Sequence, residues 1–369
     1  MKILLLPGAL KGSLSALRVG QILVRPLSPR FTLRTFPIAD GGDGFIDTFF
    51  ALDPHARLIK TRAKNAFLKT RPTSFLMLSD GKTAVLETAR ICGLGNAQKE
   101  ELAPLRASSF GVGQVLLEAV KQGAQKIYVG LGGVACNDGG SGLAMACGAQ
   151  ILDKAGHSIT LGAHPLLQAE KLDLSAVKKH FRGVQIIGVA DVVNPLLGAN
   201  GSARIFGPQK GATPSQVAVL EKCMRRWARI LKQATKRDFS HTPSAGAAGA
   251  IATGLAGCFN AKLLPGADFL IQKANLEKQF QWADLVITSE GKLDAQTFYG
   301  KAPGTVLKLA QKHKKPVLFI CGSADWKALA KQKLSRVCVA ELIHFAPSME
   351  EAQKHASRYL TQIAKSVCL

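Results

Sequence analysis

The stretch from Lys126 to Gly142, KIYVGLGGVACNDGGSG, constrains the fold of this chain most. Its start, Ile127–Val129, is a β-branched and aromatic run that predicts a short buried strand. The thirteen residues that follow contain six glycines, together with Asn137 and Asp138. Glycine lets a backbone approach a ligand closely, and α/β proteins place ligands where strands end in such loops. The stretch therefore favours an α/β fold with a ligand site here, although a tight turn capped by Asn137 and Asp138 is the alternative.

The pattern of strand, loop, helix and strand recurs near both ends of the chain. It predicts one five-stranded parallel sheet made from Lys2–Leu6, Leu33–Pro37, Leu285–Thr288, Val317–Cys321 and Val337–Leu342. The middle of the chain has a different character, because short alternating segments flank Asp80-Gly81, a typical hairpin sequence. We therefore expect residues 1–55 and 280–369 to form one discontinuous α/β domain. Residues 56–279 would form a second, inserted α/β domain with a mixed sheet, and the active-site cleft would lie between the two.

Composition limits the class of protein. The chain has 369 residues, of which 47% are apolar and 20% charged, as in a globular protein long enough for two domains. No apolar run approaches the roughly 20 residues of a membrane span, and the N-terminal MKILLLPGALKGS predicts a first strand rather than a signal peptide. The eight cysteines include no C-x-x-C pair. We expect reduced thiols in a cytoplasmic protein that does not bind membranes.

The net charge of +23 is unusual for such a chain. Basic residues concentrate in Arg57–Arg71, Lys222–Arg237 and Lys308–Arg336, and such a field attracts anions and nucleic acid. Charge runs are more often solvated faces, and Lys222–Arg237 has the pattern of an amphipathic helix. Aromatic residues make up only 6% of the chain and do not alternate with the basic runs. We therefore expect no specific nucleic-acid partner.

Carboxylates and lysines recur where predicted strands end. Phosphoryl transfer needs Mg²⁺ held by one or two carboxylates, positive charge around phosphates, and a carboxylate that orients the attacking hydroxyl. The chain supplies Asp40, Asp138, Asp191, Glu290 and Asp294 as carboxylates, and Lys11, Lys210, Lys292 and Lys301 as cations. Each of them alone could be a helix cap or a surface residue. Their joint recurrence in glycine-rich loops favours phosphoryl transfer.

Other known motifs fit less well. The chain contains no Walker A sequence, no kinase H-R-D set and no histidine in a glycine-rich loop. Gly130–Ala135 matches G-x-G-x-x-A after a strand, with Asp153 near the spacing of a ribose-binding acid. However, Asn137–Gly140 lies where the helix of a dinucleotide-binding unit should already run, and these residues are poor helix formers.

Eight longer motifs occur in a fixed order: PGALKGSLSA, PIADGGDG, SSFGVGQVL, GLGGVACNDGGSG, VADVVNPLLGANGSA, FGPQKGA, SAGAAGAIATG and SEGKLDAQTFYGKAP. Together they resemble the bacterial type I glycerate kinases over nearly the whole chain. The resemblance implies ATP-dependent phosphorylation of D-glycerate with Mg²⁺, and it leans toward the 2-hydroxyl over the 3-hydroxyl. It also implies a flavodoxin-like domain formed by both chain ends, with a second α/β domain inserted.

The chain departs from the family pattern at several positions. Gly8-Ala9-Leu10 stands in place of Asp-Ser-Phe, Val134 and Cys136 replace Ser and Thr, and Ala190 replaces Cys. Ser289 replaces Gly, and Lys292 replaces Arg, a change that keeps the charge but loses the bidentate grip on phosphate. These changes leave open an alternative, a catalytically weakened relative that binds nucleotide or nucleic acid. The surviving carboxylates and Lys210 favour an active enzyme.

The resulting site prediction divides the residues by role. Asp191 orients the glycerate hydroxyl, Asp294 and Lys11 complete the catalytic group, and Glu290 with Asp294 holds the metal. The substrate- and nucleotide-binding residues are Asp40, Gly41, Gly42, Gly132, Gly133, Asn137, Asp138, Asn194, Gln209, Lys210, Lys292 and Lys301. Asp40 and Asp138 have an alternative role, shaping their own loops by hydrogen bonds to the backbone. The expected partners are D-glycerate and ATP, with a possible homodimer.

Overall fold

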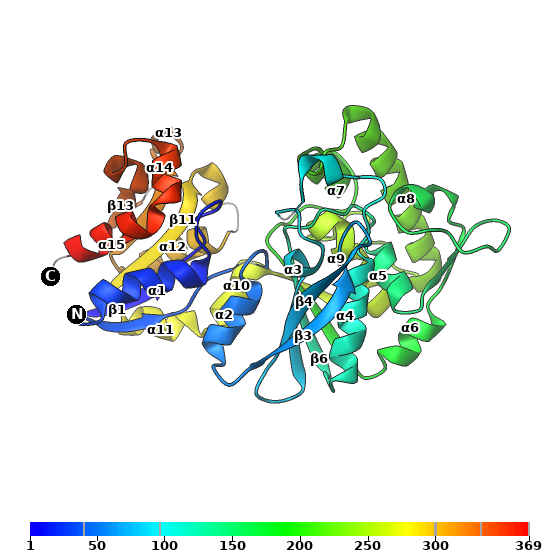
Figure 1. The fold of residues 1–369 in the computed structure, drawn as a ribbon, viewed down its shortest axis with the longest axis horizontal. Helices are drawn as coiled ribbons and strands as arrows, with labels where there is room; N and C mark the ends of the chain where they lie inside the picture. The colour runs from blue at the N-terminus through cyan, green and yellow to red at the C-terminus, as the bar shows by residue number, and fades with distance from the viewer. Residues whose placement is uncertain (40, 96, 299–300, 333, 368–369) are drawn as a thin grey trace. The chain divides into compact units, whose positions relative to one another are not determined.

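The computed structural model describes residues 1–39, 41–95, 97–298, 301–332 and 334–367, and Figure 1 shows the fold. The chain forms two compact units. The terminal unit comprises Met1–Asp40, Asp47–Pro54 and Gly266–Leu369, and the inserted unit comprises Gly41–Ile46 and His55–Pro265. The predicted fold class is confirmed, because strands from both chain ends build one parallel sheet and a mixed-sheet unit is inserted between them.

The terminal unit contains a five-stranded parallel sheet with the order β13-β12-β11-β1-β2. In chain order within this unit, the arrangement is 2-1-3-4-5, the strand order of flavodoxin. The direction of winding reverses between β1 and β11, the place where such sheets bind ligands. The strands are β1 (Lys2–Leu6), β2 (Thr32–Thr35), β11 (Leu285–Leu293), β12 (Val317–Ala324) and β13 (Val337–Glu341).

Helices cover both faces of this sheet, because alternate strand residues point to opposite sides. Leu4 and Phe319 belong to a buried cluster with residues of α11 and α12, whereas Ile3 and Ile320 belong to another with residues of α1 and α15. The helices of this unit are α1 (Ala16–Leu27), α10 (Gly266–Lys273), α11 (Leu276–Trp282), α12 (Ala302–Lys312), α13 (Trp326–Leu329), α14 (Met349–Lys354) and α15 (Ala356–Ser366). Helix α2 (Phe45–Leu52) has its first two residues in the inserted unit, and 3₁₀ turns cover η4 (Ala295–Phe298) and η5 (Leu342–Phe345).

The inserted unit contains a six-stranded mixed sheet with the order β10-β9-β6-β5-β4-β3. β5, β6, β9 and β10 run parallel, while β3, β4 and β5 are joined by antiparallel pairing. The predicted hairpin at Asp80-Gly81 is present, and Asp80 accepts hydrogen bonds from the backbone N–H groups of Lys82 and Thr83 at 2.8 Å. The strands are β3 (Arg57–Lys64), β4 (Thr70–Met77), β5 (Thr83–Glu87), β6 (Lys126–Leu131), β9 (Gln185–Ala190) and β10 (Lys262–Pro265). A separate hairpin pairs β7 (Gln150–Leu152) with β8 (Lys171–Asp173).

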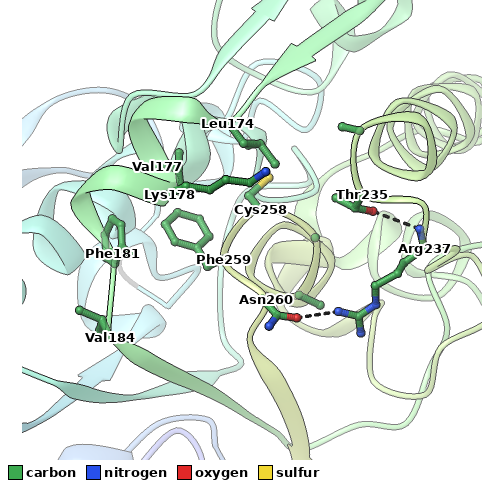
Figure 2. Close-up of a pocket in the computed structure, with 13 residues that line it drawn as sticks. Leu174, Val177, Lys178, Phe181, Val184, Thr235, Arg237, Cys258, Phe259 and Asn260 are labelled. Atoms are coloured by element: carbon green, nitrogen blue, oxygen red, sulfur yellow. Dashed lines mark hydrogen bonds between the residues drawn. The ribbon is translucent and has the colours of Figure 1, made fainter.

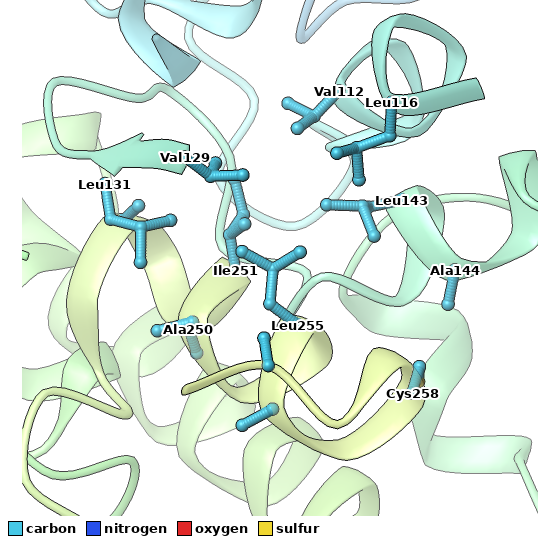
Figure 3. Packing of buried hydrophobic residues seen from close by; sticks show 14 of the residues in the cluster. Val112, Leu116, Val129, Leu131, Leu143, Ala144, Ala250, Ile251, Leu255 and Cys258 are labelled. Carbon is cyan, nitrogen blue, oxygen red and sulfur yellow. The ribbon is translucent and has the colours of Figure 1, made fainter. Parts of the chain in front are cut away.

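The helices of the inserted unit pack a large apolar core against this sheet, and Figure 3 shows residues of β6, α4, α5 and α9 that meet there. The helices are α3 (Thr88–Cys92), α4 (Phe110–Lys121), α5 (Ser141–Ala146), α6 (Ser175–His180), α7 (Ser202–Phe206), α8 (Pro214–Thr235) and α9 (Ala247–Phe259). The 3₁₀ turns are η1 (Lys99–Glu101), η2 (His164–Gln168) and η3 (Pro208–Lys210). None of the helices in the described ranges is long and apolar enough to cross a membrane.

Helix α8 explains one of the basic runs. Thr213 and Gln216 form a capping box at its start, and Cys223, Trp227 and Leu231 are fully buried on one side. Lys222 and Arg225 are exposed on the other side. The predicted amphipathic helix is confirmed, so this basic run is a solvated helix face.

The small-residue run SAGAAGAIATGLAG contains both a tight left-handed segment and a close-packed helix. Ala248, Gly249 and Ala250 have φ of 53°, 60° and 64° at the start of α9, and Ser244 shortly before them has φ of 64°. The left-handed region costs a residue with a Cβ atom roughly 1–2 kcal/mol, because Cβ lies too close to the carbonyl oxygen. Ser244, Ala248 and Ala250 therefore hold strained backbone inside a buried segment.

Replacing Ser244 by glycine tests this strain. Glycine removes the energetic penalty of the left-handed conformation. It also enlarges the conformational entropy of the unfolded chain, which reduces this gain in stability by roughly 0.4–1 kcal/mol. We expect Ser244→Gly to raise the free energy of unfolding by about 0.5–1 kcal/mol. The matched control, Ser244→Ala, also loses the hydroxyl but keeps Cβ, so it should give no gain. Urea unfolding followed by tryptophan fluorescence measures both, and equal midpoints for the two variants would contradict the strain.

Candidate active site

A small cavity of about 80 Å³ in the inserted unit brings together five of the predicted site residues, Gly132, Gly133, Asp191, Gln209 and Lys210. A water molecule occupies about 30 Å³ in the liquid, so the cavity admits only a small group, and Asp191 and Lys210 make its lining suitable for a polar one. The remaining lining residues are Leu94, Val134, Val192, Phe206, Ala248 and Gly249.

Glycine backbone packs directly beside the carboxylate of Asp191, which follows β9. A Cβ atom on Gly132 would lie 3.3 Å from Asp191 Oδ2 and 2.8 Å from the Cα of Gly42. Gly41 has φ of +111°, and a Cβ atom there would lie 2.3 Å from the carbonyl oxygen of Val189. Gly42 and Gly132, predicted from two separate loops, therefore both lie beside this carboxylate, and the loops approach each other too closely for a side chain on Gly132. Asp40, predicted for the same loop as Gly41, lies outside the described residues.

Lys210 places a positive charge at the cavity wall. Its side chain is buried, and Nζ donates a hydrogen bond of 2.7 Å to the carbonyl oxygen of Cys136. A Cβ atom on Gly249 would lie 2.8 Å from this Nζ, so the glycine makes room for the ammonium group. Burial lowers the pKa of Lys210, although the carboxylate of Asp138 opposes the shift. An ammonium group has three donors, and a small anion in the cavity would satisfy those that Cys136 does not use.

The carboxylate of Asp138 is fully buried and is turned toward the protein itself. Oδ2 accepts hydrogen bonds from the backbone and side chain of Ser109 at 2.7 and 3.0 Å, from Ser108 Oγ at 3.1 Å and from Gly142 N at 3.2 Å. Oδ1 accepts a fifth, from Gly140 N, at 3.2 Å. Burial raises the pKa of Asp138, while the hydrogen bonds act in the opposite direction. This geometry agrees with the alternative role of Asp138, in which the carboxylate shapes its own loop. It joins the starts of α4 and α5.

Asn137 and Asn194 also contact backbone rather than the cavity. Asn137 Nδ2 donates to the carbonyl oxygen of Pro104 at 3.4 Å, and its Oδ1 is buried with no hydrogen-bond partner among the described residues. Asn194 Nδ2 donates to the carbonyl oxygen of Asn200 at 2.9 Å. Both side chains therefore hold loops next to the cavity, and neither lines it.

The terminal unit gathers the remaining predicted residues at the carboxyl ends of β1 and β11. Thr297 connects two of the carboxylate residues, since its Oγ1 donates to Glu290 at 2.7 Å and accepts from Asp294 N at 3.3 Å. Lys301 Nζ forms an ion pair with Glu290 at 3.3 Å. Lys11 and Lys292 are exposed.

The reversal point of the sheet brings Lys11 next to β11. A Cβ atom on Gly291 would lie 2.9 Å from the backbone nitrogen of Lys11, so the loop after β1 contacts the end of β11. This contact lies where flavodoxin-like sheets bind ligands.

Comparison with known proteins decides the family. The model of the glycerate kinase family matches residues 3–369. The chain belongs to the glycerate kinase family. The glycerate kinase of Halalkalibacterium halodurans is 33% identical over 371 residues, covering 100% of this chain and 97% of that protein. The glycerate 2-kinase of Escherichia coli K12 is 36% identical over 332 residues, 88% of this chain and 85% of the relative.

A solved structure supports the same assignment. The crystal structure of a protein provisionally named glycerate kinase 2, from Salmonella typhimurium LT2, has a TM-score of 0.80 to this chain and 30% sequence identity. The match covers 99% of this chain and 97% of that one. This glycerate kinase family enzyme therefore shares its fold with a relative along almost its full length.

Two departures of this chain from the family pattern face each other. Gly8 stands where the pattern has Asp, and Ser289 stands where it has Gly. A Cβ atom on Gly8 would lie 2.2 Å from the carbonyl oxygen of Ser289, and Ser289 Oγ donates to the carbonyl oxygen of Gly8 at 2.8 Å. The serine hydroxyl therefore joins β11 to the loop after β1 in a position where no side chain fits on Gly8.

The predicted Mg²⁺ site can be compared with the donor atoms present. The described residues contain no group of three or more His, Cys, Asp or Glu side chains placed to hold a metal. Mg²⁺ is usually bound through one or two carboxylates together with substrate phosphates. Glu290 and Asp294, joined through Thr297, are oxygen donors of this kind, although Lys301 occupies one oxygen of Glu290. The donor set fits Mg²⁺ that is bound together with nucleotide.

A larger cavity of about 440 Å³ lies elsewhere in the inserted unit, among residues of α6, α8 and α9. Figure 2 shows its apolar side chains, with Arg237 donating a hydrogen bond of 2.7 Å to Asn260. It contains none of the predicted site residues. We therefore place the candidate site at the smaller cavity.

Sequence reasoning missed several residues that build this site. Ser108, Ser109 and Trp227 hold the loop of Asp138, and Ala248 and Gly249 line the cavity. Serines before a helix have a local explanation as caps, and this conceals their long-range hydrogen bonds. The small-residue run SAGAAGAIATGLAG is compatible with a ligand-side loop as well as with a close-packed helix, and it is the available clue to Ala248 and Gly249.

Asp138→Asn separates a structural role of this carboxylate from direct substrate binding. The amide would present N–H groups to backbone and hydroxyl donors, so at least one buried hydrogen bond is lost. We expect the free energy of unfolding to fall by about 1–3 kcal/mol. The control Asp153→Asn, made in an exposed turn that asparagine tolerates, should change it by less than about 0.5 kcal/mol. Urea denaturation compares the two, and equal stability of both variants with the wild type would contradict the structural role.

The pH dependence of the same pair gives an independent measurement. The folded-state pKa of Asp138 lies above the unfolded value of about 3.9, so the folded state binds this proton more tightly. The stability contribution of Asp138 is therefore largest below the unfolded pKa and is lost as pH rises through the folded pKa. The stability deficit of Asp138→Asn should accordingly be larger at acid pH than at neutral pH. A deficit that grows with rising pH would show that the pKa is depressed instead.

Proposed function

We propose that this enzyme transfers the γ-phosphoryl group of ATP to the 2-hydroxyl of D-glycerate, giving 2-phosphoglycerate and ADP. The observation that carries the proposal is the cavity in which the carboxylate of Asp191 and the buried ammonium of Lys210 line the same small space. D-glycerate is a small anion with two hydroxyl groups, and it needs one positive charge and one hydrogen-bond acceptor beside it.

The small size of the cavity supports phosphorylation at the 2-hydroxyl. Lys210 pairs with the carboxylate of glycerate, and Asp191 accepts the hydrogen bond of the attacking hydroxyl, as phosphoryl transfer requires. The 2-hydroxyl is on the carbon next to the carboxylate, whereas the 3-hydroxyl is one carbon farther away. In a cavity of about 80 Å³ the nearer hydroxyl is favoured. The E. coli relative is named glycerate 2-kinase, which agrees with this choice.

The donor side of the reaction is assigned to the terminal unit. Lys11 and Lys292 are exposed cations at the carboxyl ends of β1 and β11, and they bind the phosphates of ATP. Glu290 and Asp294 hold Mg²⁺, which supplies positive charge to the phosphate oxygens when bound. Lys301 keeps the carboxylate of Glu290 in place through its ion pair.

We also propose a cytoplasmic location. The seven cysteines in the described part of the chain are free thiols, six of them buried, and reducing compartments keep thiols in this state. The homodimer stays a prediction from the sequence.

The direct test is to incubate the purified protein with ATP, Mg²⁺ and D-glycerate and to identify the product by ³¹P and ¹H NMR. We expect the phosphorus to couple to the single proton on C2, and turnover to stop when EDTA removes Mg²⁺. L-glycerate is the control acceptor with the same charge. Coupling to the two protons on C3 would overturn the assigned position, and no magnesium-dependent turnover would overturn the activity.

Substitution of the cavity residues tests their roles. Asp191→Asn keeps the size but removes the charge, so kcat should fall by about 10²- to 10⁴-fold, the usual contribution of a positioned base. Lys210→Met should raise KM for D-glycerate more than KM for ATP, because it removes the partner of the substrate carboxylate. The control is Asp153→Asn, since Asp153 caps an exposed turn and Asn tolerates that position. The assignment is wrong if Asp191→Asn keeps most of its kcat while folded Asp138→Asn loses it.

A further inference from the structure

Trp326 is an exposed aromatic side chain held in place by a buried carboxylate. The residue is 55% exposed, yet Nε1 donates a hydrogen bond of 2.7 Å to Oε1 of Glu341, which is only 4% exposed. The other oxygen of Glu341 accepts a hydrogen bond of 2.7 Å from the backbone nitrogen of Ala324. Of the three tryptophans, Trp227 is fully buried and Trp282 is half-buried beneath Arg34. Trp326 thus combines an exposed ring face with a fixed edge.

The indole lies at the ligand-binding edge of the terminal unit. Trp326 begins α13, immediately after β12 ends, and β12 is the strand next to β11. Asp325 N donates to the carbonyl oxygen of Leu293 at 2.9 Å, and Ser323 pairs in register with Lys292. The exposed lysine of β11 and the indole are therefore neighbours along the carboxyl ends of adjacent strands.

Close backbone approach continues this edge to Lys11. A Cβ atom on Gly322 would lie 2.6 Å from the carbonyl oxygen of Gly291, and one on Gly291 would lie 2.9 Å from Lys11 N. Adjacent strands are about 4.8 Å apart, so β12 and β1 lie roughly 10 Å from each other across β11. Cations thus occupy one end of a short glycine-lined edge, and a flat aromatic ring occupies the other.

We propose that Trp326 is the platform on which the nucleobase of ATP stacks, with the phosphates toward Lys292 and Lys11. Glu341 is a positioning residue that fixes the plane of the indole through Nε1. The proposal rests on the proposed function, and it adds the base-binding part of the nucleotide site. A fixed ring loses little conformational entropy when a ligand binds, so stacking on it is more favourable than stacking on a mobile side chain.

Stacking also predicts the nucleotide preference. Every base has a π-face, so an aromatic platform accepts different bases. We therefore expect ATP and GTP to be used with similar KM.

The decisive variant is Trp326→Ala. Base stacking on an aromatic side chain contributes about 1–3 kcal/mol, which corresponds to a roughly 5- to 150-fold rise in KM for ATP. Trp326→Phe keeps an aromatic face and should lose much less. KM for D-glycerate and kcat at saturating ATP should stay unchanged in both variants. Unchanged KM for ATP in Trp326→Ala, with the melting temperature retained, would overturn the platform.

Inorganic tripolyphosphate separates base binding from phosphate binding. It carries the phosphates without a base, so its inhibition constant should be the same in the wild type and in Trp326→Ala. A parallel loss of tripolyphosphate and ATP binding would show that the substitution damages the phosphate region, and it would overturn the stacking role.

Glu341 gives the matched test of positioning. Glu341→Gln keeps an oxygen that can accept from Nε1, whereas Glu341→Ala frees the indole. We expect KM for ATP to rise in Glu341→Ala and to recover largely in Glu341→Gln. A purely structural role of Glu341 would lower the melting temperature without this selective change in KM.

Fluorescence distinguishes failure of this inference from failure of the proposed function, because it needs no turnover. ADP should quench the fluorescence of the wild type and of Trp282→Phe but not that of Trp326→Phe. Quenching that depends on Trp326, without phosphorylation of D-glycerate, would support the stacking role of Trp326 and overturn D-glycerate as the acceptor. If D-glycerate is phosphorylated but quenching does not depend on Trp326, the stacking role is overturned and the proposed kinase activity is supported.

Discussion

The buried carboxylate of Asp138 is the interaction on which the candidate site of the inserted unit depends. It accepts five hydrogen bonds, from Ser108, from the backbone and side chain of Ser109, and from the backbone of Gly140 and Gly142. Removing a charge from water costs several kcal/mol, and the converging donors offset part of this cost. The loop therefore has one stable arrangement, the one in which all five donors converge. A glycine-rich loop without such a buried acceptor would have many arrangements of similar stability.

This loop transmits its position to the cavity through a short series of backbone contacts. Gly139 N donates to the carbonyl oxygen of Gly249 at 3.1 Å, and Trp227 Nε1 donates to the carbonyl oxygen of Gly139 at 2.9 Å. Gly249 in turn leaves room for Lys210 Nζ, which bonds to the carbonyl oxygen of Cys136. The strained left-handed segment before α9 is thus part of the support for the lysine. Burial lowers the pKa of Lys210, whereas the nearby carboxylate of Asp138 shifts it in the opposite direction, as a bound anion would.

The sequence predicted what depends on local pattern and missed what depends on distant partners. The recurring order of strand, loop, helix and strand predicted the parallel sheet, and Asp191 and Lys210 marked loops that meet at one cavity. Ser109, by contrast, is 29 residues from Asp138, and Lys210 is 74 residues from Cys136. Such pairings exist only after folding, and serine before a helix already has a local explanation. The left-handed alanines oppose their own conformational preference, so no propensity argument finds them.

The same geometry explains how this chain keeps a charged site despite its departures from the family pattern. Lys210 bonds to the backbone carbonyl of Cys136, so replacing threonine by cysteine leaves that acceptor in place. Gly8 lacks the side chain that the family pattern has at its position, while Ser289 has a hydroxyl that the pattern lacks. This hydroxyl donates to the backbone carbonyl of Gly8. Val134 is different, because it lines the cavity and puts methyl groups where the pattern has a hydroxyl. The departures therefore alter the cavity wall more than its charges, and any change in acceptor preference should arise at Val134 rather than at Asp191 or Lys210.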